Sequence, residues 1–399
     1  MKLLRVLIVT NIIAPYRIPL YNYLHHTDEV DFKLVVLADT ERNRAWRMSE
    51  EQIKFNYRLL PGFHGFIWSR DMSIHVQWGF GRELRVFKPD VVITSGYDAL
   101  AYWEAFFYCK IFKKRYILWN GTTMLSTGKT TGPIGWMKRR IINGADRYVT
   151  YGTKAAEYLM RLGAPRERIH VGINTVDMEF YRDRAMTIRA GESFSQERRG
   201  YPRFLMLYVG QLISRKGIGQ LLRALDKLDD PDIGLLVIGS GPQEKELREF
   251  CESHALENVY FEGFHQPDDL PRYYALADLF VLPSFKEVWG LVVNEALASG
   301  LYVLCSNQAG AAYDLINEGW NGALFDPRDV EELATLVQQT KARIEEIRAR
   351  REELSEHACR EFSIERSASV FLDAIKEVRS NDPLLPSDPS GKPRNTEAE

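Results

Sequence analysis

The sequence predicts an α/β protein of two tandem Rossmann-like domains, whose parallel sheets face a central cleft. Its 399 residues exceed what one hydrophobic core usually organises, so two domains are expected. Short apolar, β-branched runs alternate with helical segments in two separate series along the chain. A polar stretch with Gly and Pro but no apolar period, residues 185–203, lies between the two series and is interpreted as a linker.

The first series predicts an N-terminal domain over residues 1–184. Its opening run, "MKLLRVLIVTNII", is expected to form a strand and not a signal peptide, because its apolar core is short and it lacks a small-residue cleavage site. Further buried strands are expected at residues 32–38, 89–95, 115–120 and 147–152, separated by helical segments such as "YRIPLYNYLHH", "GRELRVFK" and "AYWEAFFYCKIFKK".

The second series predicts a C-terminal domain over residues 204–362. Charged helical sequence begins near residue 329, and an amphipathic closing helix is expected over residues 363–379. The Pro-rich, polar residues 380–399 are expected to be disordered. Buried strands of this domain are expected at residues 204–210, 233–241, 259–264, 279–284 and 301–306.

The net charge, the cysteine and histidine content and the length of the apolar runs argue against several classes of protein. A formal net charge of −2 gives no overall electrostatic case for nucleic-acid binding. The 4 cysteines are scattered and the 8 histidines lack metal-ligand spacing, so neither a metal nor another cofactor is expected. No stretch reaches the roughly 18 apolar residues that span a bilayer. These features favour a cytoplasmic protein in a reducing compartment.

The segment "YVGQLISRKGIGQLLRAL" (208–225) joins an apolar strand to an amphipathic helix through a loop with two adjacent cations. Arg215 and Lys216, beside the N–H groups of a helix start, are suited to a diphosphate. The alternative is an ordinary solvated loop. In "VIGSGPQEKELREF" (237–250), Gly239 and Gly241 would allow close approach of a ligand, although tight strand-to-helix turns need glycine anyway.

The segment "FKEVWGLVVNEALASG" (285–300) places two glutamates eight positions apart around a Trp-Gly-Leu break. A helix is expected to begin near Gly290, so that the N–H groups of Gly290, Leu291 and Val292 point out of its start. Glu287 would lie in the loop and Glu295 about one turn into the helix, at opposite ends of one long ligand such as a nucleotide sugar. The alternative is that both carboxylates are ordinary surface charges.

These motifs, together with "VGINTVDMEFY" (171–181) and "NEGWNGALFDPRDVEELA" (317–334), resemble the retaining glycosyltransferases of family 4, which have the two-domain GT-B fold. The resemblance covers nearly the whole chain. It implies that the closing helix crosses back onto the first domain, which binds the acceptor, while the second domain binds the nucleotide sugar. It also implies a reaction of the hexosyltransferase type without a metal.

Carried over to this sequence, the resemblance implies that Lys216 and Arg215 bind the donor diphosphate and stabilise the leaving group. Glu287 would hold the transferred sugar beside the Gly290, Leu291 and Val292 amides, and Glu295 would bind the ribose. Glu287, Lys216 and Arg215 are therefore the expected catalytic residues. Gly263 and Phe264 fall where the family holds the base, and Gly239 and Gly241 complete the expected donor-binding residues.

Three departures from the family concern charge and the acceptor. Gln211 stands where the family usually has arginine, and the loop after the first strand, "TNIIAPYRIPLYNYL", contains no glycine. Arg17 in that loop would supply charge in place of backbone N–H groups. Asn120 replaces a histidine that many members place near the sugar, and Tyr97 joins Arg17 and Asn120 as an expected acceptor-side residue.

The leading hypothesis is a retaining glycosyltransferase that moves a sugar from a UDP- or GDP-linked donor to an acceptor hydroxyl, in cell-surface polysaccharide or lipid-linked glycan synthesis. The alternatives are a non-catalytic partner subunit that binds a sugar nucleotide and an epimerase on the same fold. Basic and aromatic segments at 110–119 and 134–142 would suit a peripheral membrane contact or a lipid-linked acceptor. They could equally be helices with a solvated basic face.

Overall fold

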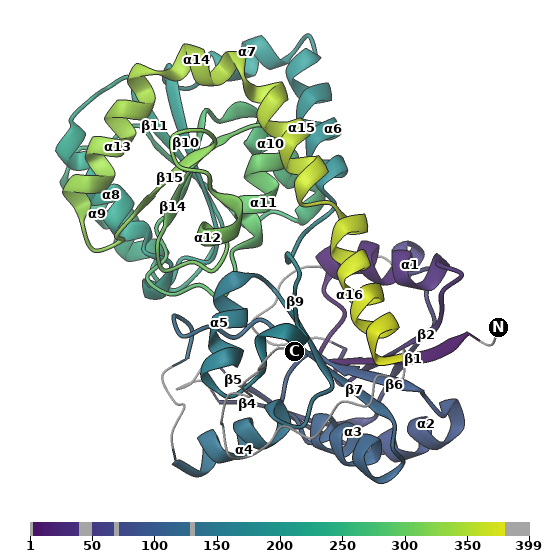
Figure 1. Ribbon diagram of the computed structural model, residues 1–399. Coiled ribbons are helices and arrows are strands. Elements are labelled where there is room, and N and C mark those ends of the chain that lie inside the picture. The colour runs from purple at the N-terminus through teal and green to yellow at the C-terminus, as the bar shows by residue number, and fades with distance from the viewer. Residues whose placement is uncertain (1–2, 40–49, 68–71, 128–131, 380–399) are drawn as a thin grey trace, which may run out of the picture.

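The computed structural model describes residues 3–39, 50–67, 72–127 and 132–379, and shows two α/β units stacked end to end (Figure 1). The expected disordered tail, residues 380–399, lies outside the described residues. Each unit has one parallel sheet, of seven strands in the first and six in the second within the described chain. This architecture confirms the predicted fold class.

The first sheet has the strand order β3-β2-β1-β6-β7-β8-β9. Its central strands are buried along most of their length, because helices cover both faces and leave no place for a polar alternation. The strands are β1 (Leu4–Thr10), β2 (Val30–Val36), β3 (Tyr57–Leu59), β6 (Val91–Thr94), β7 (Arg115–Asn120), β8 (Arg147–Thr150) and β9 (Ile169–Val171). The helices are α1 (Ile18–His26), α2 (Phe80–Phe87), α3 (Leu100–Ile111), α4 (Gly132–Ile142) and α5 (Thr153–Arg161).

The second sheet has the order β12-β11-β10-β13-β14-β15. Its strands are β10 (Phe204–Val209), β11 (Ile233–Ile238), β12 (Val259–Gly263), β13 (Leu279–Leu282), β14 (Tyr302–Ser306) and β15 (Gly322–Phe325). The helices around it are α6 (Met178–Ala190), α7 (Phe194–Arg198), α8 (Ile218–Leu228), α9 (Glu244–Ser253), α10 (Leu270–Leu276), α11 (Leu291–Ala298), α12 (Ala312–Leu315), α13 (Val330–Ala342), α14 (Ile344–Ala349) and α15 (Arg351–Glu361).

Several short elements escaped the sequence prediction. The strands β3, β9 and β15 have only three or four residues, too few for a recognisable apolar run. An antiparallel hairpin, β4 (Gly62–Ile67) and β5 (Met72–Gln77), also lies outside the expected alternation. Short edge strands are stabilised by pairing with a preformed neighbour, so their own sequence carries little signal.

The region between the two sheets is helical and differs from the expected linker. Residues 185–203 contain the second half of α6 and the whole of α7. Met178 and Tyr181 of α6 are buried in the same core cluster as Phe280 of β13, so the helix packs with the second unit before the expected linker begins. The exposed face of α6 is polar, so the helical spacing of its apolar residues is hard to recognise from the amino-acid composition of this stretch.

The last helix, α16 (Ile364–Arg379), leaves the second unit and packs on the first (Figure 1). Its Phe371 and Ile375 are buried in one cluster with Ile8 of β1 and Tyr21 of α1. The chain therefore crosses between the units twice, before α6 and again before α16. Two crossings limit how far the units can separate.

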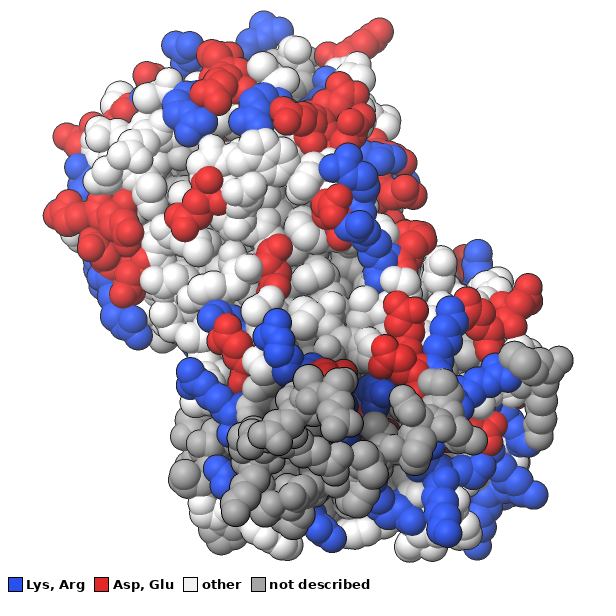
Figure 2. Space-filling model, viewed as in Figure 1, with Lys and Arg blue, Asp and Glu red and all other residues white. Residues whose placement is uncertain are grey.

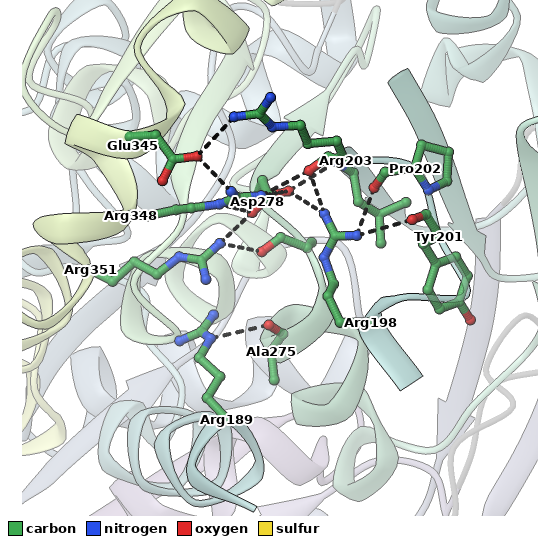
Figure 3. A network of polar contacts seen from close by, with 12 residues as sticks. Arg189, Arg198, Tyr201, Pro202, Arg203, Ala275, Asp278, Glu345, Arg348 and Arg351 are labelled. Atoms are coloured by element: carbon green, nitrogen blue, oxygen red, sulfur yellow. Dashed lines mark hydrogen bonds and ion pairs between the residues drawn. The ribbon is translucent and has the colours of Figure 1, made fainter. Parts of the chain in front are cut away.

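One buried aspartate connects the helices on the outer side of the second unit. Arg198 of α7, Arg348 of α14 and Arg351 of α15 converge on Asp278, just before β13, with N···O distances of 2.7, 2.9 and 2.8 Å (Figure 3). We call these four residues the Asp278 cluster. Although burial opposes ionisation, the hydrogen bond from Arg348 and the charges of the other arginines lower the pKa of Asp278.

Candidate active site

The loops that follow the second-sheet strands meet at one edge, because the carboxyl ends of parallel strands lie together. The carbonyl of Arg215, after β10, accepts a 2.9 Å hydrogen bond from the N–H of Phe285, after β13. The N–H of Glu287 donates at 3.3 Å to the carbonyl of Gln308, after β14. The motifs around 215, 287 and 308, which are far apart in the sequence, therefore form one surface.

Glycine is required where these loops touch backbone to backbone. A Cβ on Gly239, at φ +140°, would lie 1.8 Å from the carbonyl oxygen of Gly210, and one on Gly241 would lie 2.4 Å from that of Leu212. Gly217, at φ +71°, would meet the carbonyl oxygen of Pro283 at 1.9 Å. The predicted Gly239 and Gly241 therefore support close loop packing, which is sufficient to explain them without a ligand.

Lys216 and Glu287 form an ion pair across two loops. Lys216 ends a short 3₁₀ turn, Ser214–Lys216, and Glu287 lies between β13 and α11. Both side chains are mostly shielded from solvent, at 16% and 14% exposure. Burial, and after it the negative charge of Glu287, raises the pKa of the nearby Cys305 thiol and Tyr208 hydroxyl. A cation and a carboxylate thus lie side by side at the centre of this edge.

The helix α11 begins at this edge, as predicted. Gly290 is its N-cap residue in the left-handed region, at φ +102°, and no side chain among the described residues caps the helix. The N–H groups of Leu291 and Val292 belong to the first turn, where an α-helix has no internal acceptors. The positive end of the helix dipole lies one residue beyond the Glu287 to Trp289 loop.

Glu295 lies in a different environment from the one expected of a ligand-facing carboxylate. It is 8% exposed, and its Oε2 accepts a 2.8 Å hydrogen bond from the Tyr274 hydroxyl of α10. Burial raises its pKa to about 7, against the opposing hydrogen bonds from Tyr274 and Tyr181. A ribose contact at Glu295 stays a prediction, and it would require these tyrosine hydroxyls to share or yield the carboxylate.

The expected base-side residues are open to solvent. Gly263 ends β12 in the left-handed region, at φ +78°, and a Cβ there would meet nothing within 4 Å. The following Phe264 is 44% exposed. An exposed ring beside open space is compatible with stacking on a base, and that role stays a prediction.

The three expected acceptor-side residues follow adjacent strands of the first sheet. Arg17 follows β1, Tyr97 follows β6 and Asn120 ends β7. Tyr97 shares a 3.1 Å hydrogen bond with the Tyr158 hydroxyl, and the buried Asn120 donates at 3.0 Å to the carbonyl of Thr122. The polar groups of both residues therefore already have partners within the first unit.

A direct contact connects the carboxyl edges of the two units. Asp314 of α12 accepts hydrogen bonds from the Thr153 N–H at the start of α5, with its oxygens at 3.1 and 3.0 Å. A Cβ on the neighbouring Gly152 would lie 2.4 Å from Asp314 and 2.4 Å from the Trp289 ring. The Glu287 loop therefore lies next to the first unit. Sequence reasoning missed this contact, since neither Asp314 nor Thr153 belongs to a recognisable motif.

Comparison with known proteins places this edge in a family. Residues 191–358 match the family model described as "Glycosyl transferases group 1". This segment of the chain matches the family. The match contains the Lys216, Glu287 and Glu295 motifs, and it confirms the predicted resemblance over this segment.

Among similar proteins, D-inositol 3-phosphate glycosyltransferase of Thermomonospora curvata is 30% identical over 265 residues, which are 61% of this chain and 60% of the relative. Sulfoquinovosyl transferase SQD2 of Arabidopsis thaliana is 38% identical over 134 residues, which are 33% of this chain and 25% of the relative. The chain thus matches less than two thirds of the length of either protein.

Solved structures confirm the fold over almost the whole chain. The crystal structure of Anabaena HepE in complex with UDP has a TM-score of 0.73 at 16% identity, covering 94% of this chain and 100% of HepE. A glycosyltransferase from Rickettsia africae has a TM-score of 0.73 at 16% identity, covering 96% of this chain and 100% of its own. Identity this low establishes shared architecture alone.

The four cysteines are buried and unpaired thiols. No group of three or more His, Cys, Asp or Glu side chains suited to a metal ion occurs within the described ranges. No helix in those ranges is both long and apolar enough to cross a membrane.

Proposed function

We propose that this protein is a retaining glycosyltransferase that moves a sugar from a UDP- or GDP-linked donor to an acceptor hydroxyl. The observation that carries the proposal is the Lys216–Glu287 ion pair beside the start of α11, at the edge where the loops of the second sheet meet. A cation, a carboxylate and helix N–H groups in one place match the three chemical parts of a nucleotide sugar.

The charged residues bind different parts of the donor according to their charge. Lys216, helped by Arg215, neutralises the diphosphate as it leaves, and the start of α11 adds N–H donors. Glu287 accepts hydrogen bonds from sugar hydroxyls. When donor binds, the Lys216 ammonium exchanges its contact with Glu287 for phosphate oxygens. Phosphate oxygens therefore replace Glu287 as the partner of Lys216, and sugar hydroxyls replace Lys216 as the partner of Glu287.

The resemblance to the retaining glycosyltransferases of family 4 implies the course of the reaction. The bond between the anomeric carbon and the phosphate oxygen breaks, and the acceptor oxygen forms a bond to the same face of that carbon. The departing diphosphate oxygen takes the acceptor proton. Protein groups position both substrates and stabilise charge, so no covalent intermediate is required.

A thermal-shift panel tests donor binding. Purified protein is mixed with UDP, GDP, ADP and CMP and with their common sugar conjugates. A ligand at 100 times its dissociation constant adds about 2.7 kcal/mol to stability and raises the melting temperature by a few degrees. We expect a shift with UDP or GDP that Lys216→Ala removes. No shift with any nucleotide contradicts the proposal.

Product detection separates catalysis from the alternatives. Wild-type protein is incubated with the donor that binds, and the sugar is followed by NMR. Release or transfer of the sugar with retained configuration supports the proposed activity. A change of configuration within an intact donor indicates an epimerase. Binding without either reaction, with or without membrane extract as acceptor source, indicates a non-catalytic partner subunit.

We also propose that the first unit contacts an anionic membrane surface, which would place the acceptor among cell-surface or lipid-linked glycans. Exposed apolar side chains are concentrated on this unit. At the end of α3, Phe107, Ile111 and Phe112 are 51%, 71% and 60% exposed, and Trp136 of α4 is 68% exposed. Lys and Arg side chains gather along the lower edge of this unit, over α2 and α3 (Figure 2). Apolar side chains flanked by cations suit an anionic bilayer interface.

Vesicle sedimentation tests this contact. We expect a variant with Arg139→Glu and Arg140→Glu on α4, whose side chains are exposed, to lose binding to phosphatidylglycerol vesicles. The matched control reverses the exposed Lys245 and Arg248 of α9 in the second unit, with the same change in net charge. Equal sedimentation of both variants and the wild type contradicts docking through α4.

A further inference from the structure

Trp289 lies where the loop that carries Glu287 meets the first unit. A Cβ on Gly152, the N-cap residue of α5, would lie 2.4 Å from Cζ3 and 3.0 Å from Cη2 of the indole. The outer edge of the Trp289 ring therefore touches the backbone of the first unit. The side chain is 4% exposed and belongs to the core cluster of the second unit. One ring thus contacts both units, close along the chain to Glu287.

The other edge of the indole is fixed by a hydrogen bond to α11. Its Nε1–H donates at 3.0 Å to Oδ1 of Asn294, which is fully buried and directly precedes Glu295. Because the indole nitrogen can only donate, the oxygen of the Asn294 amide must face it. The Nδ2 group is then buried without a hydrogen-bond partner among the described residues. Asn294 therefore holds the indole while leaving one of its own donors unpaired, which lowers the stability of the fold.

Backbone hydrogen bonds connect Trp289 and Glu287 to the loop after β14. The carbonyl of Trp289 accepts at 3.0 Å from the N–H of Ala311, and the N–H of Glu287 donates at 3.3 Å to the carbonyl of Gln308. Residues 287–289 are thus held at both ends to residues 308–311. A displacement of the indole is passed to Glu287, because the two residues share this short, doubly held segment.

We propose that Trp289 is a positioning residue for Glu287, and that the first unit sets its position through Gly152. The inference rests on the proposed glycosyltransferase function, in which Glu287 accepts hydrogen bonds from the transferred sugar. The indole is held by Asn294 at one edge and by the first unit at the other, so it fixes the loop fully only while the units are in contact. A shift of about 1 Å in a group that positions a substrate can cost roughly 100-fold in rate.

Gly152→Ala tests the proposal from the first unit. Gly152 has a φ of 167°, an extended conformation that any residue adopts, so the added methyl group is opposed mainly by its neighbours Trp289 and Asp314. UDP and UDP-glucose, and GDP and GDP-mannose, are titrated calorimetrically into wild type and variant. We expect the dissociation constant of the nucleotide sugar to rise at least about tenfold relative to that of the nucleotide, whose own affinity stays unchanged.

The matched control is Gly81→Ala on α2, where a Cβ would meet nothing within 4 Å. This variant should bind all four ligands as the wild type does. Unchanged nucleotide affinity in Gly152→Ala also shows that the variant is folded. If Gly152→Ala and Gly81→Ala give the same ratio of dissociation constants, the inference is overturned.

A double-mutant cycle with Trp289→Phe separates Trp289 from Asp314, the other neighbour of the added methyl group. Phenylalanine is shorter than the indole and leaves room for the methyl group. We therefore expect Gly152→Ala to have no further effect on the ratio of dissociation constants in the Trp289→Phe background. Additive losses would show that the methyl group acts through Asp314 or the backbone, which would contradict the role of Trp289.

Asn294→Leu tests the same role from α11. Leucine keeps the approximate size of the side chain but removes the acceptor of the indole N–H. We expect the nucleotide sugar to lose affinity as in Gly152→Ala, with unchanged affinity for UDP or GDP. An equal loss for nucleotide and nucleotide sugar would show a general disturbance of the second unit and would count against the proposal.

Hydrogen exchange distinguishes a failure of this inference from a failure of the proposed function. Exchange of peptides from residues 285–311 is compared by mass spectrometry in wild type, Gly152→Ala and Gly81→Ala without ligand. We expect faster exchange in Gly152→Ala alone, and unchanged exchange overturns the inference. If the wild type binds none of the four ligands, the proposed function fails and the role in sugar binding fails with it. Faster exchange in Gly152→Ala would still support the transmission from the first unit to the Glu287 loop.

Discussion

The Asp278 cluster and Arg17 use the same side chain in opposite ways. In the cluster, three arginines form ion pairs with one aspartate that is 2% exposed, so each arginine has an acidic partner within the protein (Figure 3). The adjacent Arg189 donates to the carbonyls of Tyr274, Ala275 and Ser299. Arg17 contacts hydroxyls and aromatic rings, without an acidic partner in the described chain.

The difference teaches how position separates structure from function. The cluster lies at the amino end of β13 and joins α7, α14 and α15, far from the loops that follow the strands. Arg17 and Lys216 lie at the carboxyl edges, where ligands of doubly wound sheets bind. An arginine that is paired with an aspartate inside the protein joins helices to one another. A buried cation that awaits a substrate anion lowers the stability of the folded protein until that anion binds.

Removing the centre of the Asp278 cluster should give the largest effect. Asp278→Asn removes the ionised acceptor of Arg198 and Arg351 and leaves Arg348 with its ion pair to the exposed Glu345. Breaking a buried pair costs about 3–5 kcal/mol of unfolding free energy. Urea denaturation measures it. The control Asp183→Asn breaks an ion pair whose aspartate is 64% exposed, so a loss under about 1 kcal/mol is expected. Equal losses would remove the distinction between the cluster and the surface pairs.

Glu295 is a buried carboxyl that accepts hydrogen bonds from Tyr274 and Tyr181, and its titration should change the free energy of unfolding. Its pKa of about 7 in the folded protein lies above the unfolded value of 4.5, so the folded state holds the proton more tightly. That contribution is present below pH 4.5 and is lost as the pH rises through 7. The change is on the order of 3 kcal/mol. We expect Glu295→Gln to lack this part of the pH dependence, measured by urea denaturation from pH 4.5 to 8. Parallel curves for variant and wild type would contradict the raised pKa.

Lys216 should behave as a ligand-binding cation and not as a structural one. Lys216→Gln removes a charge-assisted contact worth about 1.5–3 kcal/mol, so the dissociation constant of UDP or GDP should rise roughly 10- to 100-fold. Calorimetric titration measures the change, and a melting scan shows whether the fold is retained. The neighbouring exposed Lys286→Gln should leave affinity unchanged. A fall in melting temperature as large as that of Asp278→Asn, with unaltered affinity, would move Lys216 into the structural group.

The contact between the units should give the smallest effect. Asp314 accepts hydrogen bonds from the backbone N–H and from the hydroxyl of Thr153, which cross from one unit to the other, and Thr153→Ala removes the hydroxyl donor. In a double-mutant cycle of Asp314→Ala and Thr153→Ala, we expect an interaction energy of about 1 kcal/mol in thermal unfolding. An interaction energy near zero would show that closure of the units depends on α16 and the Trp289 contact instead.

Much of the fold was readable from the sequence because the long central strands are buried on both faces. Runs such as "LLRVLIVT" and "FLMLYVG" must be apolar throughout when helices cover both sides of a sheet. The start of α11 at Gly290 was equally readable, because a left-handed residue before an apolar helix favours glycine. The short strand β9 and the helix α7 carry no such signal.

The sequence alone was enough to predict two doubly wound sheets and the helix start at Gly290, because apolar period and glycine placement are local properties, and its motifs carried the resemblance to the family. Only the tertiary structure decided that Glu295 is enclosed by Tyr181 and Tyr274, that Asp278 gathers three arginines, and that Arg17 has no acidic partner in the described chain. These contacts depend on which side chains, far apart in the sequence, are buried together. Burial changes the free energy of a charged group far more than its neighbours in the sequence do.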